Sequence, residues 1–369
     1  MTMKRNLCVL FAGLFFLLSH FQGRCLADGL FSFDYAIQKS SISSEDLLGD
    51  SITGVCFGDD SVCVYTSSSY EILDMTEQWK IIASVSIDHP NIRKDAPYVK
   101  QVVYESGTYY LLVFDHETSK SYIITQHENQ TNYGKLYAKE IKSFALTDDG
   151  FFMTGMDNHQ RRWNAQVSKS GTAVWEHDST TQNDVPVYCA TMDDGFLTVG
   201  SLSSTNTPSI VVLRFDSNGN ELSRNEISPA STADIASYQI FQVDATNDDV
   251  ALCGILSSGT KQVGFFLRLN QDGSIIDYQE YPQFARIQSF ANEDGQYILL
   301  AQTDMDASLP YDSYIIAEST GLLYPLEEKN SIIRSLGLSK DSNGTVYLYG
   351  MIDESVLASD GFIAELKLK

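Results

Sequence analysis

Positive charge is scarce in this chain of 369 residues. It has 25 Lys and Arg residues against 48 Asp and Glu residues, which gives a formal net charge of -23 at pH 7. Nucleic acids and anionic membrane surfaces attract proteins through a positive field, so we expect neither as a partner. The acidity is typical of a protein that stays soluble outside the cell. No calcium-loop spacing of carboxylates accompanies it.

Long apolar runs are also missing, with one exception at the N-terminus. Two basic residues precede an apolar run from Leu7 to Leu18, and Cys25-Leu26-Ala27 places small residues where a signal peptidase reads. This run is short for a membrane span of about 20 residues, and no other stretch is long enough. We therefore expect residues 1–27 to be a signal peptide, followed by an exported mature chain that begins near Asp28 and contains no transmembrane segment. A lipid anchor on Cys25 is less expected, because the residues before it lack the Leu and the small residue that are usual in a lipoprotein signal.

Familiar catalytic and cofactor motifs are absent. The sequence has no His-Glu-x-x-His, no Cys-x-x-Cys, no Gly-x-Ser-x-Gly and no glycine-rich phosphate loop. We therefore assign no catalytic residue, no metal ligand and no cofactor.

Cysteine is rare, and only four cysteines follow residue 27. Cys56 and Cys63 flank a predicted turn at Asp59-Asp60, which would place them opposite each other across a hairpin. Directly opposed residues have Cα atoms about 4.5 to 5.5 Å apart, which is within disulfide range. A disulfide between Cys56 and Cys63 is therefore a candidate. Cys189 and Cys253 fall in apolar strands of different repeats, and we interpret them as buried core residues.

A repeated pattern of strands and turns fills most of the chain. It is clearest from Asp193 to Leu222, where an Asp-Asp-Gly turn, two apolar strands separated by a polar loop, and an Asp-Ser-Asn-Gly turn follow one another. The turn between the first two strands occurs seven times at an average spacing of about 47 residues, which suits a propeller blade of four strands. The seven turns are Asp59-Asp60, Ser106-Gly107, Asp149-Gly150, Asp194-Gly195, Asp248-Asp249, Asp294-Gly295 and Asn343-Gly344.

The segments around these turns predict the strands of each repeat. Innermost strands are expected at 51–57, 99–104, 141–147, 187–192, 239–245, 286–291 and 332–338. Outermost strands are expected to include 79–85, 135–141, 172–177, 221–227 and 274–281. No helical periodicity competes with this pattern after the signal peptide. The sequence therefore predicts an all-β, seven-bladed β-propeller over residues 51–369.

The seventh repeat lacks a fourth strand of its own. Its third strand, at 362–368, reaches the end of the sequence, and an unpaired edge there would favour aggregation. The segment from Leu30 to Ile37 is strand-like and belongs to no repeat. We therefore expect residues 28–50 to supply an N-terminal closing strand and a linker.

Repeats three to five carry a resemblance to a known family. Asp149 to Gly155 reads Asp-Gly-Phe-Phe-Met-Thr-Gly, Asp194 to Gly200 reads Asp-Gly-Phe-Leu-Thr-Val-Gly, and Leu213 to Gly219 reads Leu-Arg-Phe-Asp-Ser-Asn-Gly. These segments resemble a family of exported bacterial β-propeller repeats, whose blades carry Asp-Gly-Gly-aromatic-aliphatic-x-x-Gly and later Lys-Leu-Asp-x-x-Gly-x-x-x-Trp. The resemblance implies the propeller fold and is silent about activity, because its residues are turn and core residues.

One face of the predicted propeller has more side chains suited to recognition than the other. Loops that join the second strand to the third, and each blade to the next, share this face, whereas the opposite face consists of tight turns. Imidazole and guanidinium groups there could meet an anionic or sugar ligand against an acidic surface, although surface loops also collect polar residues without any such role. The candidate ligand-binding residues are His89, Arg93, Tyr98, His116, His159, Arg161 and His177.

These observations favour an exported, monomeric propeller scaffold that binds an unknown protein or carbohydrate. One alternative is an extracellular enzyme, active on glycans or dependent on a quinone, with its site at the mouth of the central channel. Another is a structural component of the cell envelope. The sequence identifies no ring of acid, base or electrophilic residues at the channel mouth, so it favours binding over catalysis.

Overall fold

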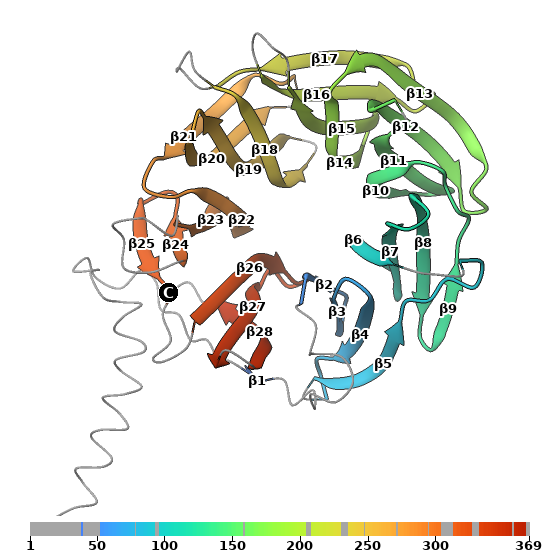
Figure 1. Ribbon diagram of the computed structural model, residues 1–369, viewed down its shortest axis with the longest axis horizontal. Helices are drawn as coiled ribbons and strands as arrows, with labels where there is room; N and C mark the ends of the chain where they lie inside the picture. The colour runs from blue at the N-terminus through green and yellow to red at the C-terminus, as the bar shows by residue number, and fades with distance from the viewer. Residues whose placement is uncertain are drawn as a thin grey trace, which may run out of the picture.

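Seven small β-sheets surround a central axis (Figure 1). The computed structural model describes residues 38–39 and 52–366, except 78, 93–95, 158, 204–207, 230–234, 247, 271, 294, 304–312, 327–331 and 356–357. Every sheet has four antiparallel strands, in an order that follows the chain from the axis outwards in six of the seven. The predicted all-β, seven-bladed β-propeller is therefore confirmed.

The first four blades each consist of four consecutive strands. Blade 1 is β2 (Gly54–Phe57), β3 (Ser61–Tyr65), β4 (Ser69–Asp74) and β5 (Lys80–Ser86). Blade 2 is β6 (Pro97–Glu105), β7 (Thr108–Asp115), β8 (Lys120–His127) and β9 (Gln130–Tyr133). Blade 3 is β10 (Glu140–Thr147), β11 (Gly150–Met156), β12 (Arg161–Ser168) and β13 (Ala173–Gln182). Blade 4 is β14 (Asp184–Met192), β15 (Gly195–Leu202), β16 (Ser209–Asp216) and β17 (Glu221–Ile227).

The last three blades follow the same plan until the ring closes. Blade 5 is β18 (Ser237–Ala245), β19 (Asp249–Ser258), β20 (Lys261–Asn270) and β21 (Ile275–Tyr281). Blade 6 is β22 (Arg286–Glu293), β23 (Gln296–Gln302), β24 (Ser313–Ala317) and β25 (Leu322–Pro325). Blade 7 is β26 (Ile332–Lys340), β27 (Val346–Ser355), β28 (Ala358–Leu366) and the N-terminal β1 (Gln38–Lys39).

An N-terminal strand closes the ring, as the sequence predicts. Gln38 pairs with Ile363 and Lys39 with Phe362, so β1 forms the outer edge of blade 7 (Figure 1). The predicted donor, Leu30 to Ile37, lies outside the described residues and directly precedes this strand.

The prediction for the outermost strand of blade 2 is wrong. The sequence interpretation placed this strand at 135–141, but β9 occupies Gln130–Tyr133 and Glu140 already begins the next blade. Between these strands, Tyr137 makes only an isolated bridge with Ser121. The polar residues of β9 hid it, because an outer strand with both faces partly in water needs little apolar alternation.

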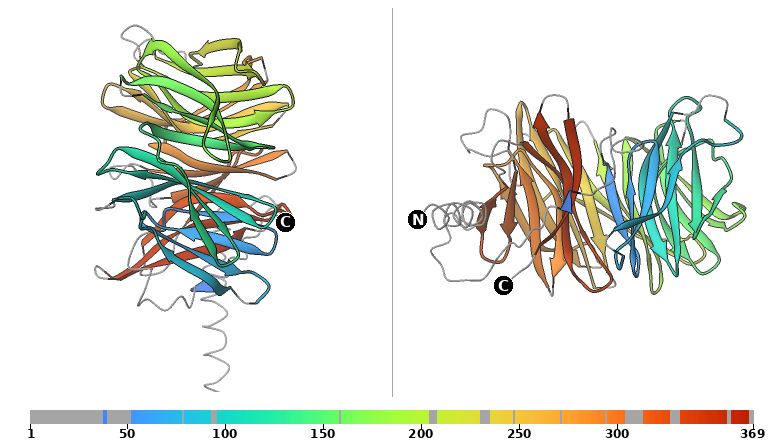
Figure 2. Two further views of the ribbon diagram at one scale, coloured as in Figure 1. Left: turned by 90° about the vertical axis from the view of Figure 1, so that its right-hand side faces the viewer. Right: turned by 90° about the horizontal axis from the view of Figure 1, so that it is seen from below.

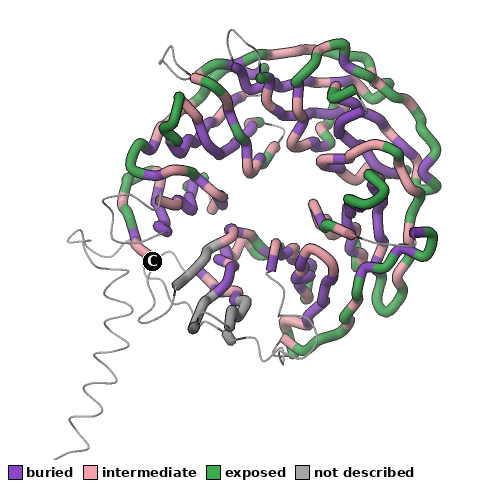
Figure 3. The backbone as a smooth tube through the Cα atoms, in the orientation of Figure 1, coloured by how far each residue is buried: buried purple, intermediate pink, exposed green. Residues whose placement is uncertain are grey.

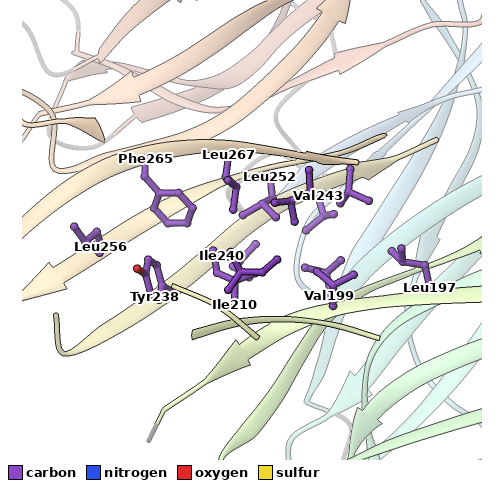
Figure 4. Packing of buried hydrophobic residues seen from close by; sticks show 14 of the residues in the cluster. Leu197, Val199, Ile210, Tyr238, Ile240, Val243, Leu252, Leu256, Phe265 and Leu267 are labelled. Atoms are coloured by element: carbon purple, nitrogen blue, oxygen red, sulfur yellow. The ribbon is translucent and has the colours of Figure 1, made fainter. Parts of the chain in front are cut away.

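The core lies between blades, because clusters of buried apolar side chains join neighbouring sheets, and buried positions concentrate on the inner strands (Figure 3). All seven residues of β11 are buried, whereas outer strands such as β13 alternate between exposed and half-buried positions. Between blades 4 and 5, Val199 and Ile210 pack in one cluster with Ile240, Leu252 and Phe265 (Figure 4). Each such large apolar side chain contributes about 1.5 to 3 kcal/mol to the stability of the folded state when it is fully buried.

The last glycine of the repeated motif fits a β-bulge in the innermost strand. Gly155 pairs with Ile141, and Gly254 pairs with Ile240, immediately before the bulge in each case. A Cβ atom on Gly155 would lie 2.4 Å from the carbonyl oxygen of Glu140, and one on Gly254 would lie 1.9 Å from that of Gln239. The motif therefore keeps glycine because the neighbouring backbone leaves no room for a side chain.

Hydrogen bonds from these bulges tie neighbouring innermost strands together around the axis. In blade 2, Gln101 accepts from the backbone N–H of Phe144 at 2.9 Å and donates to the carbonyl of Phe144 at 3.1 Å. Ser143 donates to the same Gln101 amide and accepts from the backbone N–H of Cys189, which extends the chain of bonds to blade 4.

Blades 5 to 7 repeat this arrangement. Gln242 accepts from the backbone N–H of Phe290 at 3.0 Å and donates to its carbonyl at 2.9 Å. Ser289 donates to the Gln242 amide and accepts from the backbone N–H of Leu338. The same set of hydrogen bonds from side chains to the backbone thus occurs at two places in the ring. We call each set a glutamine latch.

The two faces of the disc differ in the connections that they carry (Figure 2). We call the upper face the one with the loops that join the second strand to the third and each blade to the next. The lower face carries the hairpins that join the first strand to the second and the third to the fourth. Because all pairings within a blade are antiparallel, this assignment holds for every blade.

Candidate functional site

Tyr98 and His116 come together on the upper face of blade 2. Tyr98 lies near the start of β6 and is 41% exposed, and His116 lies in the exposed connection from β7 to β8. Their rings meet edge to face with centroids 6.1 Å apart, and the His116 ring also lies 5.0 Å from that of Phe114. Tyr98 and His116 therefore form one exposed aromatic surface.

His159 and Arg161 form a second group on the same face of blade 3. Arg161 binds Asp157 through its Nε at 3.0 Å and its Nη2 at 2.7 Å, while the exposed His159 ring lies 3.5 Å from the same carboxylate. Burial alone would raise the pKa of Asp157, but hydrogen bonds from the backbone and side chain of Arg161 and from the backbone of His159 lower it to about 2. The Arg161 charge is thus already neutralised by a carboxylate of its own loop.

His89 is a core residue and is not exposed for ligand binding. Only 1% of it is accessible, and its ring packs edge to face against Tyr122 at 4.6 Å and Tyr133 at 5.4 Å. Its Nδ1 accepts a hydrogen bond from the backbone N–H of Asn91 at 3.1 Å. His89 therefore holds the start of the connection from β5 to β6 against blade 2.

His177 lies apart from the other predicted residues. It sits within β13, pairs with Asn164 of β12, and its ring contacts Phe215 of blade 4 with centroids 5.4 Å apart. This position is in an outermost strand, where the sequence interpretation expected a residue in or beside a loop. Arg93 lies outside the described residues.

The sequence interpretation missed two lysines beside the aromatic pair. Lys100 and Lys142 are the bulged residues of β6 and β10, and each lies 2.6 Å from the same oxygen, Oε1 of Glu140. The Lys100 ammonium also lies 4.6 Å from the centroid of the Phe114 ring, which contacts His116. Lysine in a strand resembles any solvated residue in the sequence, so only the shared bulge position could have indicated the pair.

We call Tyr98, Lys100, Phe114, His116, Glu140 and Lys142 the blade 2–3 cluster. It lies on the upper face, at the start of β6, at the end of β7 and in the loop after it, and at the start of β10, in two adjacent blades. Burial lowers the pKa of Lys100, although its hydrogen bond to Glu140 opposes this effect. Burial raises the pKa of Glu140, but the bonds from both lysines outweigh it and keep the pKa below its ordinary value. The cluster therefore holds two ammonium groups and one carboxylate.

Charge is distributed unevenly along the chain, and the cluster lies in the part that is not acidic. Residues 93–169 contain ten basic and nine acidic residues, whereas residues 170–369 contain ten basic and twenty-eight acidic residues. All five histidines after residue 27 lie between positions 89 and 177. The segment 93–169, which covers blade 2 and most of blade 3, is therefore less hostile to an anionic ligand than the rest of the propeller.

Cys56 and Cys63 are paired in register, as expected, at directly opposed positions of β2 and β3. Both thiols are free in the structure, so the disulfide stays a prediction. Burial raises the pKa of Cys56 to about 12, and it raises that of Cys63 well above the ordinary value. Cys189 and Cys253 are buried, at 2% and 0% exposure.

No group of three or more His, Cys, Asp or Glu side chains in the described ranges is placed to hold a metal ion. No helix in the same ranges is long and apolar enough to cross a membrane.

The chain is similar in structure to solved WD40 β-propellers. The WD40 domain of Neurospora crassa Pan2 matches with a TM-score of 0.57 and 11% identity, covering 91% of this chain and 94% of that one. Kluyveromyces lactis Hsv2 matches with a TM-score of 0.51 and 12% identity, covering 86% and 97%. The WD40 propeller domain of Doa1 matches with a TM-score of 0.50 and 11% identity, covering 87% and 97%.

These likenesses concern the fold alone, because the identities are low. No protein-family profile matches the chain, and no curated protein matches it significantly. The resemblance to exported bacterial repeats therefore stays a prediction, while the β-propeller architecture shared with WD40 domains is established.

Proposed function

We propose that this chain is an exported β-propeller scaffold that binds a partner protein through the upper face of blades 2 and 3. One observation carries the proposal: the exposed rings of Tyr98 and His116 lie beside a pair of lysines, within the segment 93–169 whose basic and acidic residues nearly balance. Aromatic side chains with a polar atom are enriched in protein interfaces, because they bury a large area and still form a hydrogen bond.

The distribution of loops supports the same face. Lower-face hairpins such as Thr147 to Gly150 and Met192 to Gly195 leave only two residues between paired positions. Turns of this kind are occupied by residues chosen for backbone conformation. Recognition on a rigid scaffold usually resides in its longer loops, and long connections such as the one between the paired residues Gln302 and Ser313 lie on the upper face.

A comparison of matched variants tests the binding face. Peptides selected from a phage-displayed random library on the mature wild-type protein should bind the Tyr98→Ala and His116→Ala variants at least about tenfold more weakly. Glu105→Ala and Lys169→Ala, which alter exposed lower-face residues, should leave binding unchanged. Peptides that are sensitive only to the lower-face variants would contradict the proposed face.

Export rests on the pattern of residues 1–27 and needs a test of its own. We expect the mature protein, isolated from the medium or the cell envelope of a secreting host, to begin near Asp28 in N-terminal sequencing. A chain that stays in the cytosol with residues 1–27 intact would contradict export and would leave the binding face untouched.

A further inference from the structure

We propose that Lys100 and Lys142 form a receptor for a carboxylate on an acidic segment of the partner protein. This inference rests on the proposed function and assigns its ligand chemistry. Both ammonium groups already donate to one carboxylate oxygen, Oε1 of Glu140, which shows that the space between them accommodates such a group. With Glu140 included, the three side chains carry one net positive charge.

The joint between blades does not need these lysines, because a second latch in the same chain forms without them. The glutamine latch of blades 2 and 3 has the same backbone pattern as that of blades 5 and 6, with a bulge before Gln101, Ser143, Gln242 and Ser289 alike. The bulged residues are Lys100 and Lys142 in the first latch. In the second latch they are Phe241 and Gln288, and Arg286 stands where the first has Glu140. The same joint between blades therefore forms without any lysine.

The ion pairs alone do not account for the two lysines. Pairs at partly exposed positions contribute only about 0 to 1 kcal/mol to stability. Lys100 and Lys142 are 12% and 29% exposed and share a single carboxylate, so one ammonium charge has no counter-charge within the trio. Each ammonium has three N–H donors. In the part of the chain that the structure describes, only one donor of each is used, in the bond to Glu140.

The surroundings of the lysines favour an acidic peptide over a free anion. Phe114 lies under the Lys100 ammonium, and the exposed Tyr98 and His116 rings continue the surface outwards across blade 2. A bound segment could place a Glu or Asp carboxylate on the lysines and lay its neighbouring residues on these rings. The acidic remainder of the propeller would repel the same segment and thus direct it to this cluster.

The test measures binding of a fluorescein-labelled hexaglutamate peptide to the full mature chain by fluorescence anisotropy at low salt. Replacing both lysines (Lys100→Met with Lys142→Gln) should weaken binding by about tenfold or more, because it removes both donors to the carboxylate. A control that removes two exposed lysines elsewhere, Lys169→Gln with Lys261→Gln, carries the same change in net charge and should alter affinity by less than about twofold. The single variant Lys142→Gln keeps the test valid if the loss of Lys100 disturbs folding.

A transplant makes the test independent of any damage at the original site. In the Lys100→Met, Lys142→Gln background, the changes Phe241→Lys, Arg286→Glu and Gln288→Lys recreate the lysine pair on the second latch. We expect this variant to recover binding of the hexaglutamate peptide. Hexagalacturonate and inorganic phosphate serve as comparison ligands, and each should bind more weakly than the peptide.

Three results would overturn the inference. They are a peptide affinity that the loss of both lysines leaves unchanged, an equal loss in the charge-matched control, and binding of hexagalacturonate or phosphate in preference to the peptide. If peptides from the random library still depend on Tyr98 and His116 while the lysines have no effect, the proposed function survives and the carboxylate receptor fails.

Discussion

Replacing Asp184 by Asn should destabilise the propeller more than any other single change in its buried charge cluster. Asp184 begins β14 and is completely buried, as is Arg162 of the preceding blade. Arg162 donates to Oδ1 of Asp184 through its Nε at 2.8 Å and also through its Nη2, and its Nη1 reaches the Thr198 hydroxyl at 2.7 Å. Arg224 donates to the other carboxylate oxygen at 3.1 Å. One carboxylate therefore serves two guanidinium groups between blades 3 and 4.

The expected magnitude follows from what each variant leaves behind. Asp184→Asn leaves two arginines without their shared counter-charge, one of them fully buried, and such a loss costs about 3 to 5 kcal/mol of unfolding free energy. Arg162→Met removes one charge and keeps Asp184 paired with Arg224, but Oδ1 of Asp184 and the Thr198 hydroxyl lose their donors, at a cost of about 1 to 3 kcal/mol. Arg224→Met should cost least, because Arg224 is 23% exposed and also binds the exposed Glu226.

Urea unfolding followed by tryptophan fluorescence measures this order directly. The midpoint should fall most for Asp184→Asn and least for Arg224→Met, with an unchanged dependence on urea concentration. The double variant Arg162→Met, Asp184→Leu should recover part of the loss, since apolar residues often replace a buried ion pair at little cost. A loss of less than about 1 kcal/mol for Asp184→Asn, or a larger loss for Arg224→Met, would refute the reasoning.

Three further predictions concern a disulfide, a histidine and the closing strand. Mass spectrometry of unreduced mature protein should find a peptide that links Cys56 to Cys63, and alkylation of both thiols in freshly exported protein would contradict it. Burial lowers the pKa of His89 from 6.5, opposed by a hydrogen bond with the backbone of Gly134 and by Asp115. The unfolded chain therefore takes up the proton more readily, and the melting temperature should fall as pH drops below about 6.5, less steeply in His89→Gln. Deleting residues 28–39 should expose the edge of β28 and cause self-association in size-exclusion chromatography, whereas an unchanged elution volume would argue against closure by β1.

The repeat could be predicted from the sequence because its turns demand particular residues. Glycine and aspartate mark the hairpins between first and second strands, and their spacing alone gave seven blades and the seven innermost strands to within a few residues. Outer strands were predicted less well where their composition is polar. In blade 2 the more apolar segment at 135–141 resembled a strand, although the neighbouring Gln130–Tyr133 makes the pairing with β8.

The candidate site was predicted only in part, because a loop position does not reveal burial. His89 and His116 both lie in upper-face connections, yet the first is enclosed by Tyr122 and Tyr133 and the second is exposed. The pairing of Lys100 with Lys142 depends on bulges in two strands that are 42 positions apart, and the register that aligns them is a property of the folded ring. Hydrophobic patterning predicts such contacts poorly, since it carries no information on how the strands of neighbouring blades align along the propeller axis.

Comparing equivalent positions within one ring offers a way to find function in a repeat protein. Gln101 and Gln242 each accept a hydrogen bond from the backbone of the next blade. The joint between blades therefore explains why both are glutamine, and they reveal nothing about a ligand. Lys100 and Phe241 occupy the same bulge and differ in charge, so the backbone does not determine which residue stands there. A side chain that the scaffold leaves free is open to selection by a partner. The difference between the two latches therefore directs the search for a ligand to blades 2 and 3.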